Sequence, residues 1–152
     1  MNDGGPRPGV PVHISIPSAD VNTAVKAVGS DGGAIAVPAI GLAGWWKGGP
    51  RPGERGRAVI IGHLDTARGP GLFAKVPGLK RHTLVDVTDK RGAKHRYRVV
   101  GRVQVRKDRF PTEEVYGGGD APVLVLVTCG GPYVQGKGYR DNVLIYARAA
   151  TT

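Results

Sequence analysis

Three residues far apart in the sequence have side chains that together suit acyl transfer through a thiol: Cys129, His63 and Arg140. A thiol with a reference pKa of about 8.5 is mostly neutral at physiological pH, so a nucleophilic cysteine needs a base beside it. An imidazole raises the thiolate fraction and can later give a proton to a leaving amine. A guanidinium is permanently charged, and its fork of N–H groups suits an oxyanion formed during attack on an amide or thioester. The backbone N–H of the Gly130 region could share that role.

Each of these residues also has a purely structural interpretation. Cys129 is the only cysteine in the chain, and a lone cysteine is more often a small buried hydrophobe than a nucleophile. Arg140 could form a surface ion pair with its neighbour Asp141. Asp65, two residues after His63, could orient the imidazole or cap a turn, and the turn is favoured. The residues alone leave these alternatives open.

Neither a metal site nor a cofactor is expected. The segment from His63 to Asp65 offers at most two ligands, and Cys129 has no second thiolate at a spacing typical of zinc sites. The remaining histidines lie in an expected strand or among lysines and arginines that indicate solvated turns and edges: His13, His82 and His95.

Two continuous apolar runs would position the thiol and the imidazole. Residues 123–127 (VLVLV) and 58–61 (AVII) are typical of strands buried on both faces. The first run ends at Cys129, where two glycines and a proline predict an immediate turn. The second ends at His63. If the two strands are neighbours and run in the same direction, both side chains open at one end of the sheet.

Most of the remaining chain predicts short strands. Alternating or short apolar patterns favour strands at residues 11–17, 34–37, 83–88, 94–105 and 143–147. Residues 19–28 fit either a helical stripe or a strand. The chain has 25 glycines and 12 prolines, many of them between the expected strands. With about eight short strands, this indicates an all-β fold, either a barrel or a sandwich.

Four other segments are expected to lie outside the strands. Residues 44–53 are rich in glycine and proline and should be irregular, with their two tryptophans capping the core. Residues 70–76 predict one or two helical turns, and residues 110–116 a short helical turn that Thr112 could cap. Residues 130–142 predict a loop.

Composition limits the class of protein further. A chain of 152 residues with 40% hydrophobic content suffices for one domain, expected at residues 11–150 after a flexible lead-in at residues 1–10. No membrane span or signal peptide is visible, and an anchor could lie upstream. A net charge of +10 suits an anionic partner: nucleic acid, a membrane or a wall polymer. Few aromatic residues and no dense basic run disfavour nucleic acid.

The motifs closely resemble those of the sortases, the cysteine transpeptidases of Gram-positive bacteria. The resemblance covers residues 12–147 and rests on GHLDT at 62–66, TCGG at 128–131 and Arg140 at the start of the last strand. It also includes GWW at 44–46, PRPG at 50–53 and FPTEEVY at 110–116. The TCGG and YRDNV segments look most like the actinobacterial class E/F branch, and class F more than class E.

The resemblance implies a closed eight-stranded β-barrel with His63, Cys129 and Arg140 as the catalytic set, supported by Thr128 and Gly130. The implied substrate is a secreted protein with a C-terminal sorting signal of the Leu-Pro-X-Thr-Gly kind. Cys129 would form a thioacyl enzyme, which an amine of a peptidoglycan precursor or pilin would release. Family members sit on the outer face of the cell membrane through an N-terminal anchor. The resemblance also favours a strand over a helix at residues 19–28.

Two functions other than transpeptidation also fit the sequence. The same residues would serve a thiol peptidase that uses water as the acceptor, which a trial with candidate amines would separate from transfer. A basic β-barrel that binds an anionic polymer without chemistry would instead show salt-sensitive retention and an unreactive Cys129.

Overall fold

The computed structural model describes residues 7–31, 34–35, 38–39, 41–109, 121–136 and 138–150. Eight strands of this described part close into a barrel in the order β1-β2-β5-β6-β11-β12-β10-β9. Their bounds are β1 Pro11–Ile16, β2 Val21–Val28, β5 Ala43–Trp46, β6 Gly56–Ile61, β9 Leu84–Asp89, β10 Lys94–Arg106, β11 Pro122–Val134 and β12 Gly138–Ala149. The all-β prediction is therefore confirmed, and its form is a barrel.

Smaller elements decorate the barrel. Two short pairs of strands lie outside it, β3 (Ser30–Asp31) with β4 (Ala34–Ile35) and β7 (Asp65–Thr66) with β8 (Gly69–Pro70). The 3-10 turns are η1 (Pro17–Ala19), η2 (Val76–Gly78) and η3 (Lys107–Arg109). Among the described residues, no helix is both long enough and apolar enough to cross a membrane.

Alternation along β11 divides the apolar side chains between two clusters. Leu124 and Leu126 belong to the large core inside the barrel, to which most of the barrel strands contribute. Val125 and Val127 belong to a second cluster with Val59 of β6 and Leu144 of β12. Successive side chains of a strand point to opposite faces, so β11 is buried on both faces. This confirms the interpretation of the continuous apolar run.

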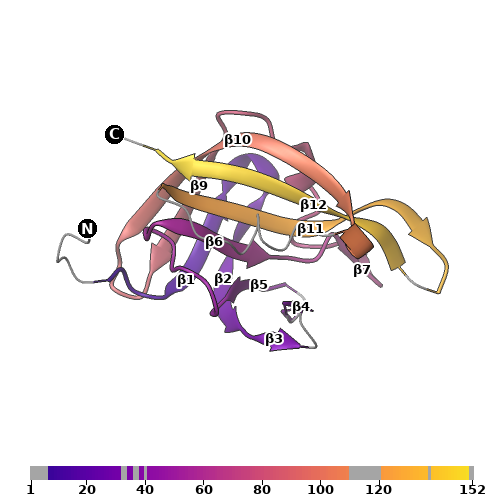
Figure 1. Ribbon diagram of the computed structural model, residues 1–152, viewed down its shortest axis with the longest axis horizontal. Helices are drawn as coiled ribbons and strands as arrows, with labels where there is room; N and C mark the ends of the chain where they lie inside the picture. The colour runs from indigo at the N-terminus through magenta and orange to yellow at the C-terminus, as the bar shows by residue number, and fades with distance from the viewer. Residues whose placement is uncertain are drawn as a thin grey trace.

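Cys129 on β11 and Arg140 on β12 lie toward the paired ends of these two long strands. Figure 1 shows the paired ends of β11 (orange) and β12 (yellow) extending beyond the barrel at the right of the view, where β7 also lies. η3 contacts β12 at this end. The hairpin therefore projects from the rigid barrel while remaining tied to it.

Three local predictions were wrong. Residues 130–142 are not a loop, because β11 continues to Val134 and β12 begins at Gly138, with a bulge between Gly130 and Tyr133. The bulge absorbs the irregular glycine and proline residues without ending the ladder. The predicted immediate turn after Cys129 is replaced by the same bulged strand.

The third error concerns a segment rich in glycine and proline. Residues 44–46 are not irregular but belong to β5, which pairs with β2 and β6. Trp45 is buried in the core and donates from Nε1 to the Pro50 carbonyl at 2.9 Å. The helical turns predicted at residues 70–76 are present as 3-10 turns, with bonds from the Ala74 N–H to the Gly71 carbonyl and from the Val76 N–H to the Phe73 carbonyl, that lead into η2. Residues 19–28 hold β2, as the resemblance implied. The helical turn predicted at 110–116 lies outside the described residues.

The segment that precedes β1 contacts the barrel within its described part. Arg7 donates from Nε to Glu54 Oε2 at 2.7 Å, and the Gly9 backbone N–H donates to Asp89 Oδ2 at 3.1 Å. Val10 packs against the large core. The domain boundary expected at residue 11 stays a prediction, and residues 7–10 have defined partners.

Candidate active site

The strands that lead to His63 and Cys129 are neighbours and run parallel. β6 pairs with β11 in the register Leu126↔Ile60 and Val127↔Ile61, and the Gly62 N–H donates to the Val127 carbonyl at 3.1 Å. The pairing therefore reaches to within two residues of His63 on one strand and of Cys129 on the other. The two apolar runs therefore form neighbouring strands that run in the same direction, as the sequence requires for a thiol and an imidazole at one end of the sheet.

Turns that follow β6 brace the backbone of His63. The His63 carbonyl accepts from the Phe73 N–H at 2.8 Å, and the Leu64 carbonyl accepts from the Gly71 N–H at 2.9 Å. An added Cβ at Gly71 would lie 2.5 Å from the His63 carbonyl oxygen. The return of the chain at Gly71 therefore needs a residue without a side chain.

The imidazole of His63 is held by a backbone carbonyl. Its Nε2 lies 2.8 Å from the Pro38 carbonyl oxygen. A carbonyl only accepts, so Nε2 carries the proton in this contact and Nδ1 is left to exchange one. No hydrogen bond between His63 and Cys129 is present among the described residues.

Cys129 itself is partly exposed and free. It is opposite Asn142 across the β11–β12 ladder, and Gly130 is opposite Asp141. Because side chains two apart on a strand share a face, Arg140 lies on the same face of β12 as Asn142. The backbone thus places Arg140 on the face of the sheet that carries Cys129.

A buried carboxylate holds the guanidinium of Arg140. Arg140 donates from Nε to Asp141 Oδ1 at 2.7 Å and from Nη2 to Oδ2 at 3.0 Å. The Asp141 side chain is only 3% exposed, against 45% for Arg140, and it also accepts from Gln104 Nε2 at 2.8 Å. These donors lower the pKa of Asp141 to about 2, with the bond from Arg140 as the largest cause.

The ion pair considered from the sequence is present, but it is not a pair between two exposed groups. Gly131 has a φ of +73°, and its missing Cβ would collide with the Asp141 carboxylate. The glycine after Gly130 therefore makes room for the group that orients Arg140. The sequence offers Asp141 only as an ion-pair partner of Arg140 and does not single it out as a site residue.

Tyr139 is a second neighbour that the sequence did not identify. Its hydroxyl donates to Asp65 Oδ2, and its ring meets that of Tyr133 edge-on with centroids 5.3 Å apart. The pKa of Tyr139 is raised, mainly by the Asp65 bond and in part by the charge of Cys129. Tyr139 thus links β12 to the segment after His63, and Asp65 binds a hydroxyl across the site in addition to its place in the β7–β8 turn.

The two supporting residues lie on either side of the thiol. Thr128 is 2% exposed, and its Oγ1 has no hydrogen-bond partner within the described part of the chain. Gly130 is buried, and a Cβ there would lie 2.5 Å from Val143 Cγ2. Within the described ranges no three His, Cys, Asp or Glu side chains are grouped as a metal site.

Comparison with known proteins places this arrangement in a family. The sortase-domain family model matches residues 14–150. No curated protein matches the chain.

Several solved structures share the fold. Sortase A from Corynebacterium diphtheriae has a TM-score of 0.71 at 23% identity, over 98% of this chain and 64% of that chain. Sortase C-1 from Actinomyces oris has a TM-score of 0.72 at 18% identity, over 93% of this chain and 74% of that one. A Clostridium perfringens sortase D5 transpeptidase has a TM-score of 0.70 at 18% identity, over 94% and 79% respectively. Because the family model matches residues 14–150 and the fold is the same as that of solved sortases, the chain belongs to the sortase family.

Proposed function

We propose that this protein is a cysteine transpeptidase that cleaves a Leu-Pro-X-Thr-Gly-like sorting signal and transfers it to an amine of the cell wall or of a pilin. The observation that supports the proposal most is the parallel pairing of β6 with β11, the two strands that lead directly to His63 and Cys129. The family carries the expectation of transpeptidation. Arg140 on the neighbouring strand supplies a cation on the same face.

The first half-reaction forms a thioester. The Cys129 sulfur attacks the carbonyl carbon of the threonine in the signal, and the C–N bond to the next residue breaks. His63 takes the thiol proton as the sulfur attacks and passes it to the leaving amine. In the second half-reaction the acceptor amine attacks the thioester and His63 takes a proton from it. The C–S bond then breaks, and His63 returns the proton to the departing sulfur to restore the thiol.

Arg140 would stabilise the oxyanion in both steps. Asp141 occupies Nε and Nη2, and the contacts of the described residues leave Nη1 to donate to the substrate. A guanidinium already oriented by a buried carboxylate costs little reorganisation at the moment of attack. The Gly130 N–H and Thr128 would support the acyl group beside the thiol.

The proposal also includes the cellular location of the protein and its class within the sortase family. The protein would act on the outer face of the cell membrane, held by an anchor upstream of this chain. The TCGG and YRDNV segments favour class F, and residues 11–150 would form the catalytic domain. No cofactor is required by these steps.

The test is capture of the thioacyl intermediate. Incubation with a Leu-Pro-X-Thr-Gly peptide should give a covalent adduct by mass spectrometry, located on Cys129 and absent from Cys129→Ala. Added amine should convert the adduct to a ligated peptide. His63→Ala should form the adduct far more slowly. Release of free acid only, whichever amine is supplied, would favour the hydrolytic peptidase. An unreactive Cys129 would reject the proposal.

A further inference from the structure

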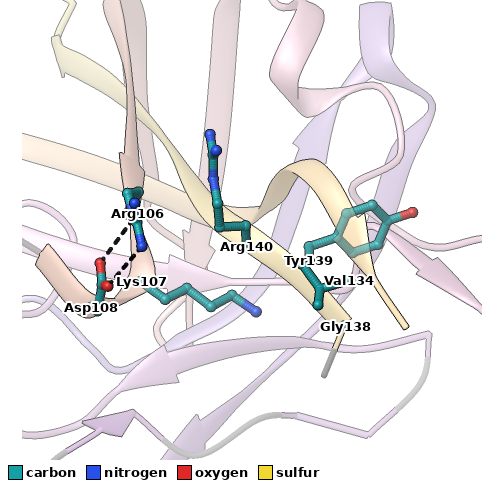
Figure 2. Close-up of a pocket in the computed structure, with 7 residues that line it drawn as sticks. All are labelled: Arg106, Lys107, Asp108, Val134, Gly138, Tyr139 and Arg140. Carbon is teal, nitrogen blue, oxygen red and sulfur yellow. Dashed lines mark hydrogen bonds and ion pairs between the residues drawn. The ribbon is translucent and has the colours of Figure 1, made fainter. Parts of the chain in front are cut away.

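A basic pocket of about 400 Å³ adjoins the candidate site. Arg106, Lys107 and Asp108 line it from the end of β10 and from η3, and the β11–β12 hairpin lines it with Val134, Tyr139 and Arg140. Figure 2 shows the Lys107 side chain extending from η3 toward Val134 and Gly138, while Arg140 and Tyr139 leave β12 in different directions.

The charges of this pocket are unbalanced. Arg106 is paired with Asp108, Nη2 to Oδ2 at 3.1 Å, but both side chains are more than half exposed. Such a pair is weak and readily exchanged. Arg140 is paired with Asp141, which is buried on the other side of it. Lys107 has no ion-pair partner among the described residues. The pocket therefore offers an unneutralised cation, Lys107, beside one exchangeable arginine, Arg106, and beside Arg140, which Asp141 holds in place.

The pocket is close to the thiol. Arg140 lines the pocket and lies two residues from Asn142, which is opposite Cys129 across the β11–β12 ladder. Tyr139 also lines the pocket, and its hydroxyl donates to Asp65 in the segment after His63. The pocket therefore adjoins the part of the ladder that carries Cys129.

We infer that this pocket binds a carboxylate carried by the amine acceptor, so that the preferred acceptor is an amino-acid amine with a free carboxylate close to it. This inference rests on the proposed function. A simple alkylammonium would be repelled by Lys107, Arg106 and Arg140, whereas an attached carboxylate would be attracted. The same cations favour the neutral form of a nearby amine, and that form is the nucleophile in the second half-reaction.

A binding experiment tests the pocket without any catalysis. Glycylglycine and glycylglycinamide share the same amine and differ in the carboxylate, so both are titrated into Cys129→Ala and followed by NMR. Glycylglycine should bind about threefold to fivefold more tightly, as expected for one exposed charge pair. Its shifts should map to the residues of the pocket, and added salt should reduce the preference.

Variants of Lys107 show whether the preference arises in this pocket. Lys107→Gln should remove most of the preference, and Lys107→Arg should restore it. Lys90→Gln is the matched control, because Lys90 is an exposed lysine in the hairpin between β9 and β10, at the far end of β10 from Arg106. Equal binding of the two dipeptides, or a preference that survives in Lys107→Gln, would overturn the inference.

Kinetics separate this inference from the proposed function. Acyl-enzyme formation by the unmodified protein tests the proposed function, and the acceptor's KM in the transfer step tests the pocket. Lys107→Gln should raise the KM of glycylglycine severalfold and leave that of glycylglycinamide unchanged. Absence of an acyl enzyme would reject the proposed function while the NMR result still decides the carboxylate site. A carboxylate preference found for the donor peptide and not for the acceptor would assign the pocket to the other substrate and overturn the inference.

Discussion

Asp141 is the residue that decides which way Arg140 points. A buried carboxylate needs donors, and Arg140 and Gln104 supply them. The direction of the guanidinium is therefore set before substrate arrives, as electrostatic catalysis requires. Asp141 acts through Arg140 and is a positioning residue.

Replacing Asp141 by Asn should misdirect Arg140 and slow acylation by about tenfold, roughly the worth of one charge-assisted hydrogen bond. The pKa of Asp141 is lowered to about 2 in the folded protein, so its stabilising effect is present above the ordinary carboxyl pKa and is lost as the pH falls through about 2. The gap in Tm between the unmodified protein and Asp141→Asn should therefore shrink between about pH 4 and pH 2. A gap that does not change with pH would contradict the ion pair.

Variants of Arg140 distinguish a role in stabilising the oxyanion from a merely structural role. Arg140→Ala should slow acyl-enzyme formation by roughly 100- to 1000-fold if the guanidinium donates to the oxyanion. Arg140→Lys keeps the charge but not the fork, so most of the loss should persist. Single-turnover acylation rates measured beside Tm values decide the matter. Full activity of the alanine variant would remove Arg140 from the site, and full activity of the lysine variant would reduce its role to charge.

At the scale of elements, the turn after β6 positions His63. Gly71→Ala would place a Cβ 2.5 Å from the His63 carbonyl oxygen and 2.9 Å from the Asp65 nitrogen, so the histidine backbone must shift. A shift of about 1 Å in the position of a catalytic group can slow the reaction by about 100-fold. Gly78→Ala is the matched control, because nothing lies within 4 Å of a Cβ there. Acylation rates of the two variants should differ by at least tenfold, and equal rates would show that the turn does not position His63.

The strands that carry the site were predictable, and their ends were not. Continuous apolar runs such as residues 123–127 predict burial on both faces, which the two clusters around β11 confirm. The extension of β11 past Cys129 was missed because two glycines and a proline are typical of a turn. A bulge lets the ladder tolerate them, and only the partner strand reveals it. Strand β5 was missed for the same reason, since β2 and β6 supply its partners.

The residues that orient the site could not be predicted from the sequence either. Cys129, His63 and Arg140 were identified through their chemistry and their motifs. Tyr139 and Asp141 act through contacts with Asp65 and Arg140 that depend on how β12 lies against its neighbours. A tyrosine and an aspartate beside an arginine have many ordinary uses, so neither residue type nor spacing singles them out.

At the scale of the whole molecule, we expect the segment before β1 to stabilise the barrel, and truncation tests this. Deleting residues 1–9 removes the Arg7 pair with Glu54 and the Gly9 bond to buried Asp89. Loss of the Gly9 bond to the buried Asp89 should cost about 1 kcal/mol and lower Tm by about 2–4 °C. Peptide turnover at 25 °C should stay unchanged, as expected for a segment outside the catalytic domain. Deletion of residues 1–6 alone keeps both contacts and is the control. A large fall in kcat would instead make the segment part of the active site.

The parallel pairing of β6 with β11 has a consequence for the order in which this protein folds. The pairings of β9 with β10 and of β11 with β12 join strands that follow each other in the chain, whereas β6 with β11, β10 with β12 and β1 with β9 join strands that are far apart in it. The β6–β11 pair joins residues 66 apart, from Ile61 to Val127, and closing so long a loop is slow in comparison with forming a hairpin. The strand ends that lead to Cys129 and His63 therefore come together only when this long-range pairing forms. Under the proposed function, a nascent or partly folded chain would carry a cysteine without its base, and transpeptidase activity would appear only with the finished fold.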